Sequence, residues 1–169
     1  MRKQKGFSLI ELLIVVAIIL IIAAIAIPNL LRARIAANES SAVGSTRTVN
    51  TAQVAYNSAY PTVGYATNLT NLSGNCSSAL PSSTAACLID NVLGGSNNPT
   101  KSGYSFTLGQ GTGGPVGGIQ ATYEFDGAPA APNQSGVRYF CGSNDGVVRY
   151  NQTTAFSGTN CQTNGSPLQ

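Results

Sequence analysis

The sequence contains no histidine and no tryptophan, and only 9% of its 169 residues are charged. Without histidine, the chain cannot build a Ser/His/Asp or Cys/His catalytic set. The usual Cys/His zinc site is also excluded, because there is no Cys-x-x-Cys pair and no histidine to complete one. The composition therefore predicts a protein that is not an enzyme and that uses no cofactor and no metal.

The sequence also lacks a basic surface, although its formal charge is +3. Arg2, Lys3 and Lys5 account for this excess, and basic and acidic residues balance beyond residue 6. A nucleic-acid-binding protein would concentrate positive charge in its folded part. The charge pattern therefore indicates neither a nucleic acid nor a small-molecule ligand as a specific partner.

One long apolar run is present, from Phe7 to Ile27, and it is interrupted only by Ser8 and Glu11. About 20 apolar residues match the roughly 30 Å hydrocarbon core of a bilayer. The run is longer than a secretory h-region and no small-x-small cleavage site follows it. Basic residues before the run predict a membrane helix with its N-terminus in the cytoplasm.

The helical pattern continues beyond the membrane segment, to about Tyr60, and Pro61 marks its end. Pro28 should kink or loosen the helix where the membrane part ends. In the segment 29–60, apolar residues recur every seven positions and predict one buried stripe on a polar helix. The stripe comprises Ile35, Ala42, Val49 and Tyr56, with Ala52 and Ala59 beside them.

The remaining residues predict a loop region over 61–103 and an antiparallel sheet over 104–169. Strand signals occur at YSFTL, IQATYEF, VRYFC and VVRY, which begin at Tyr104, Ile119, Val137 and Val147. Asp145-Gly146 favours a hairpin between the last two strands. The stretches GQGTGGPVGG and GAPAAPNQSG are typical of turns. The predicted fold class is α+β, with the sheet covering the stripe of the helix.

The four cysteines all follow the apolar run, which favours disulfide bonds in an exported region. Three connectivities are possible, and proximity in sequence favours Cys76–Cys87 and Cys141–Cys161. Three carboxylates raise a separate question, because Glu124 and Asp126 alternate on one strand face and could join Asp145 in a calcium site. Surface charge is the favoured explanation for these three residues.

The segment KGFSLIELLIVVAIILIIAAIAIP, from Lys5 to Pro28, closely resembles the leader and N-terminal helix of type IV prepilins. This resemblance implies that a prepilin peptidase removes residues 1–6 by cleaving between Gly6 and Phe7, and that Phe7 becomes the N-methylated N-terminus. Glu11 matches the glutamate of the family and Pro28 its helix-breaking proline. Strand-rich C-terminal halves with a closing disulfide are familiar in the family. The motif covers only the first quarter of the chain.

The resemblance gives Glu11 a role in assembly. A charge in a membrane-length segment costs about 2.5–3.5 kcal/mol unless it is compensated. The amine that cleavage exposes on Phe7 can meet Glu11 of a neighbouring subunit in a filament core. The alternative is that Glu11 neutralises the amine of its own Phe7, which lies one helical turn away.

The function implied is that of a structural subunit, the major pilin, of a type IV pilus with the pilin fold. Its expected partners are copies of itself, the prepilin peptidase, the inner-membrane assembly machinery and, before assembly, the membrane. The chain would reside in the inner membrane with a periplasmic head and would later enter an extracellular fibre for adhesion, twitching motility or DNA uptake. The alternatives are a pseudopilin of a type II secretion system, a minor pilin, and a membrane-anchored binding module that does not polymerise.

Overall fold

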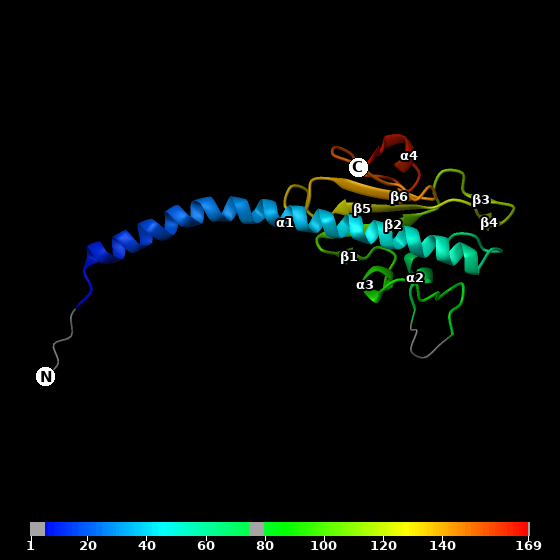
Figure 1. The fold of residues 1–169 in the computed structure, drawn as a ribbon, viewed down its shortest axis with the longest axis horizontal. Helices are drawn as coiled ribbons and strands as arrows, with labels where there is room; N and C mark the ends of the chain where they lie inside the picture. Colours follow the sequence, from blue (N-terminus) through cyan, green and yellow to red (C-terminus); the bar gives the residue numbers. More distant parts are fainter. Residues whose placement is uncertain (1–5, 75–79, 169) are drawn as a thin grey trace. The chain divides into compact units, whose positions relative to one another are not determined.

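A computed structural model describes residues 6–74 and 80–168. The chain divides into two units, Met1–Arg34 and Ile35–Gln169. The helix α1 (Leu9–Ala59) is the first element and belongs to both units. The order of the elements along the chain can be followed in Figure 1.

The first unit is the N-terminal part of α1. Leucine, isoleucine and alanine dominate this segment, and they favour a helix in a setting that supplies no water to the backbone. Pro28 lies inside α1 and does not end it. Because proline has no amide hydrogen, the carbonyl of Ala24 loses its usual intrahelical partner there.

In the second unit, the predicted stripe of α1 is largely confirmed. Ala42, Val49, Ala52 and Tyr56 are buried. Ile35 is only half-buried, and the prediction is wrong for Ala59, which is exposed at the end of the helix. Polar side chains of the same helix are buried beside the stripe, namely Glu39, Ser45, Thr46, Asn50 and Gln53.

The sheet confirms the predicted α+β fold class. It contains six strands in the order β1-β2-β5-β6-β7-β8, and every neighbouring pair is antiparallel. The strands are β1 (Thr100–Lys101), β2 (Tyr104–Gly109), β5 (Glu124–Pro129), β6 (Tyr139–Ser143), β7 (Val148–Asn151) and β8 (Ser166–Pro167). A separate ribbon consists of β3 (Pro115–Val116) and β4 (Ile119–Gln120).

Aromatic rings of the central strands form the core between the sheet and α1. Phe106 and Phe125 stack with their centroids 5.2 Å apart, and Tyr104 and Phe140 lie beside them. The helix approaches β6 closely at Gly142, where an added Cβ would lie 2.5 Å from Oδ1 of Asn50. Glycine at this position leaves room for the side chains of Asn50 and Thr46, which any added side chain would displace.

The strand predicted from Ile119 to Phe125 is interrupted in the structure. Gln120 lies in β4, and its backbone exchanges hydrogen bonds of 2.9 Å with Val63 and Tyr65. The main sheet resumes only at Glu124. Two predicted turns also contain strand residues, since β3 lies within GQGTGGPVGG and β5 extends into GAPAAPNQSG as far as Pro129.

The predicted loop region contains more regular structure than expected. It includes the short helices α2 (Leu69–Leu72) and α3 (Asn91–Gly94), which bury Leu69, Leu72 and Leu93. Asp90 caps α3 by accepting a hydrogen bond of 2.9 Å from the amide of Leu93. The start of this region is fixed to α1 by Gln53, whose amide group donates to the carbonyl of Ala66 and accepts from its amide.

Candidate processing and assembly site

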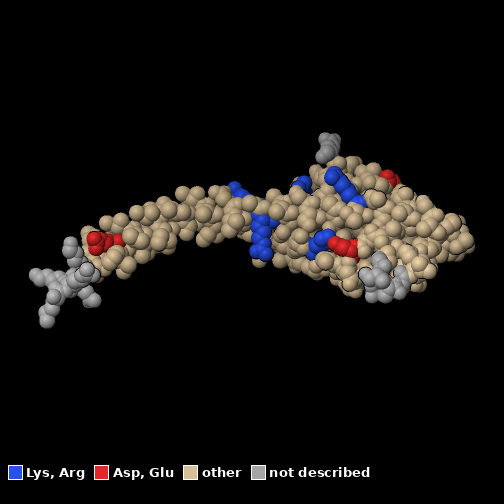
Figure 2. All heavy atoms as spheres, turned by 60° about the horizontal axis from the view of Figure 1, so that its bottom comes forward, with Lys and Arg blue, Asp and Glu red and all other residues tan. Residues whose placement is uncertain are grey.

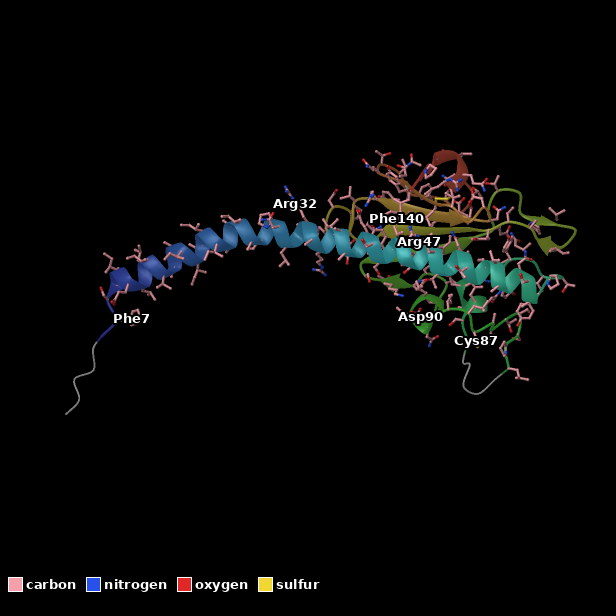
Figure 3. The ribbon with its side chains drawn as sticks, viewed as in Figure 1. Phe7, Arg32, Arg47, Cys87, Asp90 and Phe140 are labelled. Carbon is pink, nitrogen blue, oxygen red and sulfur yellow. A yellow bond between two sulfur atoms is a disulfide. The ribbon has the colours of Figure 1, made fainter. Side chains whose placement is uncertain are left out.

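The Gly6–Phe7 peptide bond lies just before α1, in a segment that is not helical. Phe7 is 81% exposed, and apart from its neighbours in the chain no atom of the described residues lies within 4 Å of the position where Gly6 would carry a Cβ. Figure 3 shows Phe7 at the start of the helix. On the described side, the Gly6–Phe7 bond is therefore exposed and outside the helix.

Glu11 caps the helix through a hydrogen bond that the sequence analysis missed. The amide of Ser8 donates to Oε2 of Glu11 over 2.9 Å, and the Ser8 carbonyl accepts from the amide of Leu12 over 3.3 Å. A serine followed three residues later by a glutamate is the signature of a capping box. This Ser-x-x-Glu pattern was readable in the sequence and would have predicted the contact.

The Glu11 side chain has no basic partner within residues 6–74 and 80–168, and no ion pair there includes it. In the uncleaved chain the nitrogen of Phe7 is an amide, so it carries no charge. Hydrolysis of the Gly6–Phe7 bond would convert it into an amine within one helical turn of the carboxylate. The arrangement can therefore acquire a cation only after cleavage.

The helix that follows Glu11 exposes an apolar surface on all sides. Side chains from Leu12 to Leu31 are mostly more than 40% exposed, and α1 is the one described helix long and apolar enough to cross a membrane. In Figure 2 this surface is uncharged apart from acidic atoms near its N-terminal end. Such a surface needs a bilayer or other apolar helices to cover it.

Glu124 and Asp126 are not surface charges, so the favoured explanation for them was wrong. They are 1% and 6% exposed, on the face of the sheet opposite Phe125. Glu124 accepts from the amides of Asn160 and Cys161 over 3.1 and 2.7 Å. Asp126 accepts from the amide of Gly158 through Oδ2 over 2.7 Å, whereas its Oδ1 is buried without a partner.

Burial, together with the adjacent charge of Glu124, raises the pKa of Asp126 to about 8. At neutral pH the carboxyl group of Asp126 therefore favours its protonated, uncharged form. Asp145, the third candidate calcium ligand, is instead bound to Arg149 over 2.6 Å. No group of three or more potential metal ligands occurs among the residues that the structure describes.

Cys141 and Cys161 form a disulfide bond that joins β6 to α4 (Cys161–Asn164). Their Cα atoms are 5.8 Å apart. Cys141 lies directly opposite Asp126 in the sheet, so the disulfide and the carboxyl pair hold the same C-terminal segment. Cys87 is also bonded, but Cys76 lies outside the described residues, and the Cys76–Cys87 pairing stays a prediction.

An ion pair between helix and sheet was also missed. The Glu39 carboxylate binds the guanidinium of Arg138 over 2.7 Å and the amides of Val137 and Arg138 over 3.0 and 3.2 Å. These residues are about 100 positions apart, and no local pattern signals such a contact. Only the placement of Glu39 next to the buried stripe could have indicated that it is not a solvent-exposed residue.

Comparison with known proteins finds similarity in the N-terminal part of the chain. Residues 1–27 match the family model of the prokaryotic N-terminal methylation motif. The type IV wide pilus major component PilA4 of Thermus thermophilus is 68% identical over 40 residues, which is 24% of this chain and 30% of the relative. The type IV major pilin protein PilA of Myxococcus xanthus is 46% identical over 54 residues, 32% of this chain and 24% of the relative.

These matches span less than a third of the length of either relative. No solved structure matches the chain. The family model therefore covers the leader and the N-terminal part of α1, including Gly6, Phe7 and Glu11.

Proposed function

The chain carries the N-terminal helix of a type IV pilin, and from this premise we propose that it is the major structural subunit of a type IV pilus. The observation that carries the proposal is the exposed apolar segment of α1 up to Leu31, in which Glu11 is the one charged residue. Glu11 lies one helical turn from the exposed Gly6–Phe7 bond. The role is structural and not catalytic. Both relatives are named as major components, which favours a major over a minor subunit.

In the proposed pathway, the precursor sits in the inner membrane with its N-terminus in the cytoplasm, as the basic residues of the leader favour. A prepilin peptidase hydrolyses the Gly6–Phe7 bond and methylates the new amine, which keeps its positive charge. The membrane assembly machinery then transfers the subunit into a growing filament. Apolar helices of neighbouring copies replace the lipid around Leu12–Leu31.

Glu11 provides the register of assembly in this proposal. Its carboxylate would give up the hydrogen bond from the Ser8 amide and form an ion pair with the charged amine of Phe7 on a neighbouring copy. A carboxylate and an amine that meet in an apolar filament core compensate each other, whereas either one alone would be costly there. Pairing of Glu11 with the amine of its own chain remains the competing arrangement, and it could precede the intersubunit pair.

The experiment that tests the proposal is intact-mass analysis of filaments sheared from the cell surface. The expected result is that this chain is the dominant species, begins at N-methylated Phe7, and has lost four hydrogens to two disulfide bonds. A processed chain found only in the inner membrane would instead support a pseudopilin of a type II secretion system. An unprocessed chain would contradict the proposal and favour a membrane-anchored module. Adhesion, twitching motility and DNA uptake are the roles that such a fibre could serve.

A further inference from the structure

Two arginines, Arg32 and Arg34, follow the apolar run on α1. In the head, Lys101, Arg138 and Arg149 each form an ion pair with a carboxylate. Arg32 and Arg34 form no ion pair or side-chain hydrogen bond within the described residues, and both are exposed. No acidic residue lies three or four positions from either one, where a helical partner would have to be.

These arginines lie about one bilayer thickness from Glu11. From Glu11 to Arg32 the helix rises by about 31 Å at 1.5 Å per residue. The hydrocarbon core of a bilayer is about 30 Å thick. No charged residue occurs between the two positions. When Glu11 is at one boundary of the hydrocarbon layer, Arg32 and Arg34 are therefore at the opposite boundary, at the level of the lipid headgroups.

The two guanidinium groups also project from different sides of the helix. A separation of two residues corresponds to a rotation of about 200° around the helix axis, with an axial offset of only about 3 Å. Figure 3 shows Arg32 directed away from the helix axis into open space. One protein partner would contact a single side of the helix and leave one arginine unpaired. A lipid surface surrounds the helix and can bind both.

We propose that Arg32 and Arg34 bind the phosphodiester headgroups of the lipid leaflet at this end of the helix and fix the depth of the helix in the membrane. Guanidinium groups form paired, charge-assisted hydrogen bonds with phosphate oxygens, which an ammonium group cannot match in geometry. The inference rests on the membrane stage of the proposed function. It adds an interaction surface that is separate from the cleavage site and from Glu11.

The direct test is solid-state NMR of the full chain in phospholipid bilayers, with ¹³C at the guanidinium carbon of arginine and ³¹P in the lipid. A bound headgroup places these two nuclei within about 4–5 Å, which produces strong dipolar dephasing. The expected result is a loss of the dephased component in the Arg32→Gln/Arg34→Gln variant. Arg47→Gln is the matched control, because Arg47 is also exposed on α1 and is outside the three ion pairs of the head but lies 13 residues further along the helix. It should leave the dephasing unchanged.

Two further arms identify the source of the phosphate. In bilayers of a galactolipid without phosphate, the dephasing should disappear, and added inorganic phosphate should not restore it. Restoration by inorganic phosphate would show a free-anion site and overturn the lipid assignment. Equal dephasing in wild type and in the Arg32→Gln/Arg34→Gln variant would overturn it as well, as would arginines that contact carboxylates of other copies instead of phosphorus.

A depth measurement gives an independent readout. Since the chain contains no tryptophan, Ile27→Trp provides a single fluorescent reporter near the two arginines. Without the arginines, the reporter end of the helix should move toward the bilayer centre, while Glu11 at the other end moves into water. Quenching of the tryptophan by lipids that are brominated deep in their acyl chains should therefore increase. The Arg32→Lys/Arg34→Lys pair should restore part of the depth. An unchanged depth in the glutamine variant would contradict the proposal.

The outcomes separate this inference from the proposed function. A chain that forms filaments but shows no arginine–phosphate contact contradicts only the lipid inference. A chain that shows the contact but is never processed or assembled contradicts only the assignment as a pilus subunit.

Discussion

Glu39 on α1 and Arg138 just before β6 form a 2.7 Å ion pair whose carboxylate is only 8% exposed. Glu39 also accepts hydrogen bonds from the amides of Val137 and Arg138. The Arg138 guanidinium lies 5.5 Å from the ring centroids of both Phe140 and Tyr150. This single contact therefore fixes the helix, the start of β6 and an aromatic pair relative to one another.

Replacing Glu39 by alanine should destabilise the head by about 2 kcal/mol, because two partly buried amides and a guanidinium lose their acceptor. Urea-induced unfolding of the detergent-solubilised chain, followed by circular dichroism, measures the change. Ser40→Ala is the matched control on the exposed side of the same helical turn and should change the free energy of unfolding by less than about 0.5 kcal/mol. Equal effects of the two substitutions would show that the ion pair is unimportant.

Glu39 should also make the head sensitive to acid. Burial alone would raise the pKa of Glu39, but hydrogen bonds from Val137 and Arg138 and the charge of Arg138 outweigh it, and the net pKa is lowered. A carboxyl group with a lowered pKa in the folded state contributes stability above its unfolded pKa, and this stability is lost as pH falls through the folded value. Thermal unfolding between pH 6 and pH 3 should show a smaller loss for Glu39→Gln than for wild type.

Asp126 should have the opposite pH dependence. Its pKa is raised to about 8 by burial and by Glu124, so the folded state holds a proton that the unfolded state releases near pH 4. The stability from this group is complete at low pH and is lost as pH rises through about 8. After correction for the intrinsic, base-catalysed rise of hydrogen exchange, the protection of the Gly158, Asn160 and Cys161 amides should fall above pH 8. Ionised Asp126 would place a buried charge beneath that segment, and its Oδ1 has no hydrogen-bond partner there.

The Asp126→Asn variant is the control for this prediction. Its amide can donate to Glu124 and still accept from Gly158 at every pH, so exchange at these amides should lose its dependence on this ionisation. If wild type and Asp126→Asn respond alike between pH 6 and pH 9, Asp126 does not ionise in this range and the prediction is wrong.

Glu11→Ala should abolish filaments while leaving the chain processed and in the membrane. The variant removes the only carboxylate in the apolar segment, which is the proposed charge partner of the Phe7 amine. Shearing of cells followed by immunoblotting of the fibre and membrane fractions measures this outcome. Ser8→Ala is the matched control, since Ser8 contacts Glu11 through its backbone amide and the variant retains that bond. Abundant filaments from Glu11→Ala would rule out the assembly role.

Removal of the Cys141–Cys161 disulfide should destabilise the C-terminal segment. The two cysteines are 20 residues apart, and in the chain-entropy model a loop of that size contributes about 3 kcal/mol. Differential scanning calorimetry of the Cys141→Ala/Cys161→Ala variant measures the loss, with exposed Thr163→Ala as control. A melting temperature equal to that of the control would mean that Glu124 and Asp126 hold the segment without the covalent link.

The sequence predicted the parts of this fold that depend on local pattern. The seven-residue repeat of Ala42, Val49 and Tyr56 identified the buried face of α1, and the strands at Tyr104 and Val147 appeared close to their predicted positions. It failed where a distant partner decides the outcome. Gln120 pairs with the segment 63–65 and leaves the main sheet, and nothing within the run IQATYEF signals this.

Among the candidate site residues, too, some could be identified from a local motif and others depend on contacts that are distant in the sequence. Gly6, Phe7 and Glu11 belong to one short motif that can be read in order, and their roles in processing and assembly stay predictions. Glu124 and Asp126 looked like surface residues because alternating acidic residues usually face water. Their burial depends on the chain folding back after β7, which places the amides of residues 158–161 over the carboxyl groups.

The raised pKa of Asp126 affects the charge that the proposed fibre would carry. The unit from Ile35 onward contains four basic and five acidic side chains, and one of the acidic ones holds a proton at neutral pH. In formal charge, four basic side chains then balance four acidic ones, so copies stacked in the proposed fibre would accumulate little net charge. Above about pH 8 every head would gain a negative charge at once, and a long polymer would multiply that small change by its number of subunits.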